Sequence, residues 1–313
     1  MAFPVFDLGE FEASSGDARA TQAVSLDQIC RDTGFLSVTN HGVPQVVIDN
    51  VWSAAAEFFA QPTEAKQSVK APEPGYPYGY LGPNSEALAA SKGGETPPDL
   101  KESFNGGPRQ APDGMTDPQA LGFCYAPTLW PDLPNFRPAW TAYYAAMEDL
   151  AARIMTAFAA SLELPDNYFA PYIDAPISAL RALHYPQTQG AARDGQQRAG
   201  AHTDYGSLTI LLPQVNRRGL QIMMSDGAWK DIDAEQGAFV INIGDLMARW
   251  TSDRWVSTLH RVVAVPDQPA RQSLAFFHQP NWDAEIVPLD GSDAYPPVRS
   301  GPYLMDKFQS TSA

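Results

Sequence analysis

The sequence is poor in several features that would each point to a particular class of protein. Its 313 residues include only two cysteines, Cys30 and Cys124, which lie far apart and in no metal-binding spacing. This argues against a disulfide framework and favours free thiols in a reducing compartment. No apolar stretch approaches the length of a membrane span, and the first residues lack the basic and apolar segments of a secretion signal. We therefore expect a cytoplasmic protein with no membrane partner.

Positive charge is also scarce. The 36 acidic residues outnumber the 21 lysines and arginines, the formal net charge is −15, and no basic run occurs anywhere in the chain. Nucleic acids and anionic membrane surfaces attract basic proteins, so we expect no nucleic-acid partner. Any anionic ligand must be held by a few local arginines against this overall field. The sequence shows no exposed apolar patch, so a monomer is the default expectation.

The composition supports one large domain. Hydrophobic residues make up 44% of the chain, with 7 Trp, 12 Tyr and 15 Phe, which is enough for a sizeable core. No internal repeat or linker divides the chain, so residues 1–313 are expected to form a single domain. We divide it into a helical and Pro/Gly-rich loop region at 1–136, a scaffold helix within 137–177, a β core at 178–290 and a C-terminal tail at 291–313.

The hydrophobic pattern changes from helical to strand-like along the chain. Within residues 137–163, large apolar side chains recur every three or four positions, which predicts a helix with one buried face: Trp140, Tyr143, Met147, Leu150, Ile154, Phe158 and Leu162. From residue 178 onward, short apolar segments follow one another without helices between them, from "SALRALHYP" to "AEIVPL". This succession predicts a mainly β fold with flanking α-helices and an antiparallel sandwich or jelly-roll core.

Two side chains with metal-binding chemistry stand at the head of one apolar run. In "GAHTDYGSLTILL", His202 and Asp204 are two positions apart, and residues i and i+2 of a strand share one face. We therefore expect both side chains to project toward the buried side. A carboxylate buried beside an imidazole needs a strong partner, and a metal ion is the commonest. Each residue taken singly also fits a structural role, Asp204 as a turn residue and His202 as a hydrogen-bonded core group.

Two later segments add to this pair. "STLHRVVAV" supplies His260 at the start of a strand, and "RQSLAFF" places Arg271 and Ser273 on one strand face. Two imidazoles and one carboxylate form a facial triad that binds iron(II) and leaves coordination positions open. An arginine with a serine hydroxyl suits a carboxylate ligand.

The arrangement H-T-D, H and R-x-S resembles that of the isopenicillin N synthase-like group of iron(II)- and 2-oxoglutarate-dependent dioxygenases. Further segments along nearly the whole chain resemble landmarks of this group: "PVFDL" near the start, "GFLSVTNHGVP" at 34–44, "FFAQPTEAK" at 58–66, "PPDLKESFNGG" at 97–107 and "HQPNWDAEIVPL" at 278–289. The resemblance implies a double-stranded β-helix, which is the distorted, cupin-like form of the jelly roll.

The resemblance also implies roles for individual residues. His202, Asp204 and His260 would bind Fe(II), while Arg271, Ser273 and Tyr185 would hold the distal carboxylate of 2-oxoglutarate. Many members carry a polar residue two positions before this tyrosine, whereas this chain has Leu183. Phe277, which shares the inward face of its strand, and Phe104 in "DLKESF" are candidates for the substrate pocket. His184 and His278 are expected to face away from the cavity, because they alternate with Tyr185 and Phe277, and His41 is expected to be structural.

The implied activity is the oxidation of a small-molecule substrate by O2, by hydroxylation, desaturation or ring formation, with release of succinate and CO2. The nearest alternative is an iron(II) oxidase of the same fold that does not use 2-oxoglutarate, as in isopenicillin N synthase. A non-catalytic metabolite-binding barrel is a third hypothesis, which the intact triad disfavours. A hydrolytic zinc site lacks an obvious general base near the triad.

Overall fold

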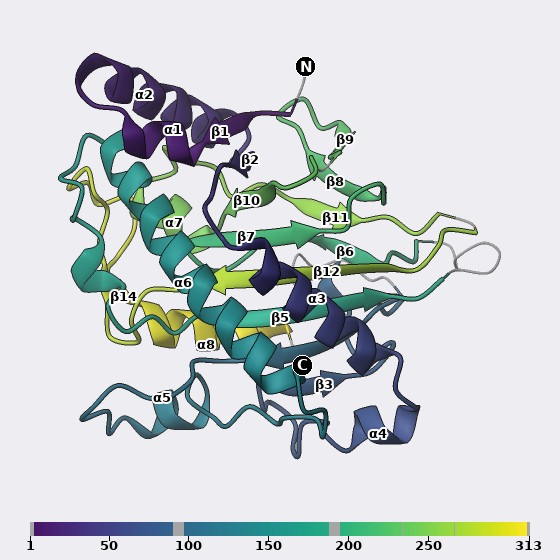
Figure 1. Ribbon diagram of the computed structural model, residues 1–313. Helices are drawn as coiled ribbons and strands as arrows, with labels where there is room; N and C mark the ends of the chain where they lie inside the picture. Colours follow the sequence, from purple (N-terminus) through teal and green to yellow (C-terminus); the bar gives the residue numbers. More distant parts are fainter. Residues whose placement is uncertain (1–2, 90–96, 188–194, 234, 266, 312–313) are drawn as a thin grey trace.

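A larger and a smaller β-sheet, with helices outside them, make up the computed structural model (Figure 1). The structure describes residues 3–89, 97–187, 195–233, 235–265 and 267–311. None of the helices in these ranges is long and apolar enough to cross a bilayer. Cys30 and Cys124 are buried, free thiols.

The larger sheet has eight strands in the order β1-β2-β10-β7-β12-β5-β4-β3. Strands β1 and β2 pair in parallel, and every other pair in this sheet is antiparallel. In that spatial order the strands are β1 (Val5–Asp7), β2 (Phe35–Thr39), β10 (Phe239–Ile243), β7 (Leu208–Pro213), β12 (Arg271–His278), β5 (Ala179–Tyr185), β4 (Glu102–Gly106) and β3 (Gly79–Leu81).

The smaller sheet has four antiparallel strands in the order β6-β11-β8-β9. They are β6 (Ala199–His202), β11 (His260–Val262), β8 (Leu220–Met223) and β9 (Trp229–Asp231). A separate two-stranded ribbon joins β13 (Glu285–Ile286) to β14 (Val298–Arg299). Side chains from both main sheets line one cavity, so the jelly-roll core expected from the sequence is confirmed.

Helix α6 (Phe136–Ser161) is the main support of the larger sheet and runs diagonally across it in Figure 1. Its apolar stripe is buried as predicted, and it contacts β7 and β12 of the sheet and the helices α2 and α3. The helices other than α6 are α1 (Leu8–Ala13), α2 (Gly16–Asp32), α3 (Gln45–Phe59), α4 (Thr63–Gln67), α5 (Pro118–Gly122), α7 (Asp245–Trp250) and α8 (Ser300–Thr311), with a short 3-10 helix η2 (Ala170–Tyr172).

The sheets extend beyond the β core that we expected at 178–290, into the N-terminal region and the C-terminal tail. Four strands of the larger sheet, β1 to β4, come from the region before residue 137, so the sheet is not confined to 178–290. Strand β4 is hard to detect because it is buried on both faces and still polar, with Glu102 neutralised by Lys66 and bonded to Tyr80 and His184. The expected tail contains α8, and "AEIVPL" supplies only the short strand β13.

Candidate metal and cosubstrate site

The three predicted metal ligands lie together where the smaller sheet meets the start of β7. His202 is the last residue of β6 and His260 is the first residue of β11. The two are direct partners in the antiparallel ladder, so strand pairing alone brings both imidazoles to one place. Asp204 lies beyond the end of β6, in the connection to β7. The prediction that His202 and Asp204 share a strand with "LTILL" is therefore wrong, because a turn and not strand alternation aims the carboxylate.

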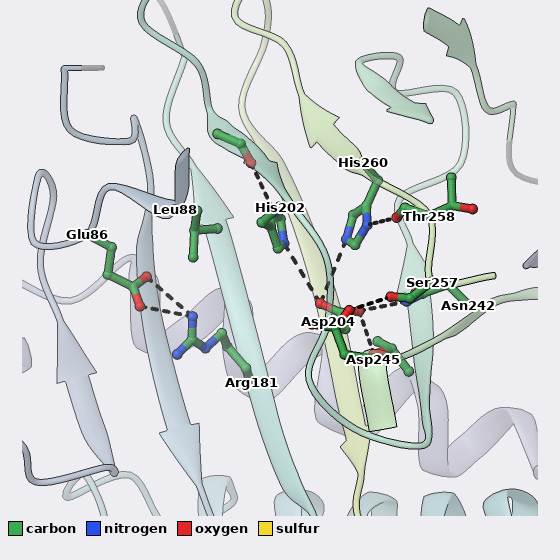
Figure 2. A network of polar contacts seen from close by, with 12 residues as sticks. Glu86, Leu88, Arg181, His202, Asp204, Asn242, Asp245, Ser257, Thr258 and His260 are labelled. Atoms are coloured by element: carbon green, nitrogen blue, oxygen red, sulfur yellow. Dashed lines mark hydrogen bonds and ion pairs between the residues drawn. The ribbon is translucent and has the colours of Figure 1, made fainter. Parts of the chain in front are cut away.

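The ligand atoms surround a common point. One donor atom from each of His202, Asp204 and His260 can be chosen so that all three lie within 4.8 Å of one another. The Oδ1 atom of Asp204 is 3.8 Å from Nε2 of both histidines, and Figure 2 shows the three side chains directed toward each other. These separations are too long for hydrogen bonds and suit atoms that share a metal ion.

Hydrogen bonds fix which nitrogen of each imidazole faces this point. Nδ1 of His202 is 2.7 Å from the carbonyl oxygen of Gly200, and Nδ1 of His260 is 3.1 Å from that of Thr258. A carbonyl oxygen only accepts, so each Nδ1 carries the proton and each Nε2 presents a lone pair. This is the tautomer that metal-binding histidines adopt.

The carboxylate of Asp204 is oriented in the same way. Its Oδ2 atom accepts hydrogen bonds from Oγ1 of Thr209 at 2.6 Å and from Nδ2 of Asn242 at 2.7 Å. Oδ1 is then left facing the two imidazoles. One carboxylate oxygen with two neutral imidazole nitrogens is the donor set of a divalent transition-metal site, so these residues fit iron(II).

The protonation states also favour a metal. Burial, followed by the nearby His260, lowers the pKa of His202 to about 3. Burial raises the pKa of Asp204, but the two imidazoles and the hydrogen bonds from Thr209 and Asn242 outweigh it, and the pKa lies below its usual value. At neutral pH the imidazole of His202 is therefore neutral and the carboxylate is charged, which are the forms that bind metal ions.

Arg271 and Tyr185 meet at another part of the same cavity. They are direct partners across the β12–β5 ladder, and the guanidinium carbon of Arg271 lies 5.4 Å from the centre of the Tyr185 ring. Ser273 and Leu183 line the cavity beside them. The Arg271 side chain is buried, and its Nε and Nη1 groups have no hydrogen-bond acceptor in the part of the chain that the structure describes. A buried, unpaired guanidinium is costly, so this group fits a carboxylate ligand.

The cavity has a volume of about 770 Å³ and extends along β12 from Arg271 at its start to a second end beside Phe277. Strand residues Phe277, Arg181 and Asn105 line it there, together with Leu304 and Phe308 of α8. Phe277 was predicted as a pocket residue, and it does line the cavity. The sequence interpretation missed the other four. Arg181 could have been found, because it shares strand parity with Tyr185, whereas nothing in the sequence places α8 against the cavity.

Phe104 is the one candidate that the structure places elsewhere. Its side chain is fully buried on the helix side of β4, where it packs edge-to-face against Phe58, Phe136 and Trp140. The prediction that Phe104 forms a pocket wall is wrong, because strand alternation turns the neighbouring Asn105 toward the cavity instead.

His184 and His278 lie where the alternation predicted. His184 stacks on Phe59 and bonds to Glu102 on the helix side of the sheet. His278 is buried behind the cavity, with its Nδ1 atom 2.7 Å from Oγ of Ser207. His41 has its Nε2 atom 3.2 Å from a backbone carbonyl oxygen.

Comparisons with known proteins agree with this geometry. Residues 3–133 match the family model described as the N-terminal region of non-haem dioxygenases in morphine synthesis, and residues 176–280 match the 2OG-Fe(II) oxygenase superfamily. A 2-oxoglutarate-Fe(II) type oxidoreductase of Emericella nidulans is 32% identical over 288 residues, which cover 90% of this chain and 80% of that protein. Validamycin A dioxygenase of Streptomyces hygroscopicus subsp. limoneus is 31% identical, with coverage of 97% and 85%.

Solved structures give the same result. The crystal structure of a full-length Neurospora crassa protein in complex with alpha-KG and thymine superposes with a TM-score of 0.86 at 30% identity, covering 99% of this chain and 97% of that one. A rice dioxygenase for auxin oxidation superposes with a TM-score of 0.75 at 27% identity, covering 98% and 95%. The chain belongs to the isopenicillin N synthase-like family of iron(II)- and 2-oxoglutarate-dependent dioxygenases, and it is an oxidoreductase of that kind.

Proposed function

We propose specific roles for the residues of this dioxygenase. His202, Asp204 and His260 hold the iron, and Arg271 with Ser273 and Tyr185 holds the distal carboxylate of 2-oxoglutarate. The unpaired, buried N–H groups of Arg271 carry this proposal, because they lie in the cavity that also contains the three metal ligands. When bound, iron(II) and 2-oxoglutarate together reduce O2 to an oxidant that removes hydrogen from a substrate C–H bond, with release of succinate and CO2.

The protein's own residues position the reactants and exclude water. The hydrogen bonds from Thr209 and Asn242 hold the Asp204 carboxylate in one orientation. The ring of Phe35 lies 5.2 Å from that of His260 and shields it. Leu183, Leu220 and Val262 line the cavity and form an apolar cluster with Tyr185, one of the residues that we assign to 2-oxoglutarate. Such a dry cavity strengthens the electrostatic contacts within it and protects reactive species from water.

An anaerobic titration tests these roles. Iron(II)-loaded protein titrated with 2-oxoglutarate should develop the visible charge-transfer band of a chelated 2-oxo acid. The band should saturate, should be absent in His202→Ala, and should need a much higher 2-oxoglutarate concentration in Arg271→Ala, since the carboxylate loses its charged partner. Normal affinity in Arg271→Ala would show that the distal carboxylate binds elsewhere.

We further propose that the substrate is a neutral small molecule with hydrogen-bond donors. Arg181 is a cation at the second end of the cavity, which we assign to the substrate. It is already paired with Glu86, with Nη1 lying 3.1 and 3.3 Å from its two carboxylate oxygens (Figure 2). Lys101 lies between Glu86 at 3.3 Å and Asp99 at 2.8 Å. Two cations and two carboxylates leave no net charge to attract an anion.

Two unpaired polar groups at this end are acceptors. The side-chain carbonyl oxygens of Asn105 and Gln279 are buried, line the cavity and have no donor among the residues that the structure describes. Phe277 offers an apolar surface beside Arg181. A small ring compound with N–H or O–H groups would satisfy the two oxygens. The Neurospora crassa protein, whose crystal structure contains thymine, supports this class of ligand.

A matched panel tests the substrate class. Succinate formation should be stimulated by neutral cyclic amides and imides, with thymine included, more than by their carboxylated analogues. Glu86→Gln should shift this preference toward the carboxylated compounds, because Arg181 loses its partner. A wild-type preference for the anionic analogues would contradict the proposal.

A further inference from the structure

Arg198 is a fully buried arginine that none of the roles above uses. It precedes β6, four positions before the metal ligand His202, and its side chain is 0% exposed. Fully buried arginines are rare unless they are paired with an anion. In the described part of the chain Arg198 has no carboxylate partner, and its Nε and Nη1 groups have no acceptor.

One nitrogen of Arg198 joins the ends of two strands. Nη2 lies 2.9 Å from the carbonyl oxygen of Pro186, 3.0 Å from that of Pro269 and 3.3 Å from that of Gln268. Pro186 directly follows Tyr185 at the end of β5, and Pro269 is two residues before Arg271 at the start of β12. The guanidinium group is therefore fixed beside both residues that we assign to the distal carboxylate of 2-oxoglutarate.

Two uncompensated positive charges thus lie near each other, and one of them, Arg271, lines the cavity. Both guanidinium groups are buried, and both keep their Nε and Nη1 groups unpaired among the described residues. The pKa of Arg198 is lowered, first by burial and then by repulsion from Arg271. Like charges in a low-dielectric interior are unfavourable until an anion lies between or beside them.

We propose that Arg198 is a second cation of the 2-oxoglutarate site, which strengthens the binding of the distal carboxylate by its charge and orients Arg271 and Tyr185 through the two strand ends. This inference rests on the proposed role of Arg271. The alternative is that Arg198 only connects the two strand ends. That role would need hydrogen bonds to the carbonyl groups but no positive charge, so the two explanations predict different ligand affinities when the charge is removed.

The test compares two ligands that differ only in the distal carboxylate. 2-Oxoglutarate and 2-oxopentanoate both chelate iron through the 2-oxo acid, but 2-oxopentanoate ends in a methyl group. Calorimetric titration of the iron(II)-loaded protein under argon gives the Kd of each without turnover. The variants are Arg198→Gln, Arg198→Lys and Arg271→Gln, with Arg153→Gln as control, since Arg153 also donates to a backbone carbonyl group, that of His41, but lies on α6.

Loss of the charge at position 198 should weaken the binding of only one of the two ligands. Arg198→Gln should raise the Kd of 2-oxoglutarate about tenfold and leave that of 2-oxopentanoate nearly unchanged. Arg198→Lys should retain most of the preference for 2-oxoglutarate, and Arg153→Gln all of it. An equal weakening of both ligands in Arg198→Gln, or an unchanged Kd for both, would overturn the proposal.

Arg271→Gln tests the role of Arg198 independently of the role proposed for Arg271. It also provides a test if the Arg198 variants fail to fold. It should lose part of the preference for 2-oxoglutarate and retain the part that Arg198 supplies. Complete loss of the preference would overturn the role of Arg198 alone. An unchanged preference would overturn the assignment of Arg271 to the distal carboxylate.

Discussion

Single hydrogen bonds decide how the Asp204 carboxylate faces the metal. Oγ1 of Thr209 is one of only two donors to Oδ2 in the described part of the chain. Thr209→Val keeps the shape of the side chain and removes the donor, so the carboxylate gains freedom to rotate. We expect iron affinity to fall by about 10- to 100-fold, measured by anaerobic competition with a chelator. Thr203→Val is the matched control, because the Thr203 hydroxyl has no partner among the described residues, and its effect should be small.

His278 should make stability depend on pH. Burial lowers its pKa to about 4, whereas an unfolded histidine titrates near ~6.5. The unfolded chain therefore binds one more proton as the pH falls from 6.5 to 4, and the free energy of unfolding should fall by about 3 kcal/mol across this window. Urea unfolding of wild type and His278→Gln should show a shallower pH dependence in the variant. Identical slopes would mean that His278 is not buried in its neutral form.

The metal ligands could be predicted from the sequence, but the reason for their proximity could not. Residue types and spacing identified His202, Asp204 and His260, whereas the turn that aims Asp204 depends on how β6 ends. Arg198 and Asn242 were missed because a buried polar residue looks like a surface residue until its neighbours are known. Phe104 was misplaced for a related reason, since a strand assignment without its register does not tell which face meets the cavity.

At the scale of secondary structure elements, the two faces of strands such as β4 and β12 have different roles. Side chains on the helix side stabilise the fold, and side chains on the cavity side serve the function. Phe104 on β4 is fully buried against the helices, so Phe104→Ala should reduce the free energy of unfolding by about 3–5 kcal/mol. Phe277 on β12 lines the cavity and is partly exposed, so Phe277→Ala should cost about 1 kcal/mol and impair substrate oxidation. Urea unfolding and succinate assays on both variants check this. Equal losses of stability would contradict it.

Elements with a regular apolar pattern in their own sequence were predicted well. Elements that form only because of contacts with neighbouring parts of the fold were not. Helix α6 and strand β12 carry strong hydrophobic signals, and both form as expected. Helix α8 begins with Ser-Gly-Pro and has no such signal, so it depends on its neighbours. A Cβ atom at Gly301 would lie 2.1 Å from the Trp282 ring, so only glycine lets α8 pack this closely.

At the scale of the whole molecule, the net charge of −15 opposes the approach of 2-oxoglutarate, which is a dianion. Salt screens this repulsion, since the Debye length falls from about 30 Å at 0.01 M to about 8 Å at 0.15 M. We expect the association rate measured by anaerobic stopped flow to rise about two- to fivefold over this range, while the dissociation rate changes little. The singly charged 2-oxopentanoate should respond less. A fall of the rate with salt would indicate a locally positive entrance.

The fold as a whole was accessible from the sequence because its β core follows from strand succession and its family from several matching segments. Apart from the strand residues Phe277 and Arg181, the walls of the substrate end were not accessible, because they meet only in the folded chain. They come from residues 70–78 and 84–88, from Phe123 and Cys124, and from Leu304 and Phe308.

None of these wall segments supplies a metal ligand, and this separation has a consequence for the history of the enzyme. Mutations can accumulate in the walls over generations while iron and 2-oxoglutarate stay bound, so a lineage can exchange one substrate for another without passing through an inactive ancestor. For the same reason, a laboratory that seeks a new specificity should randomise α8 and the 70–78 segment and leave β6, β11 and β12 intact.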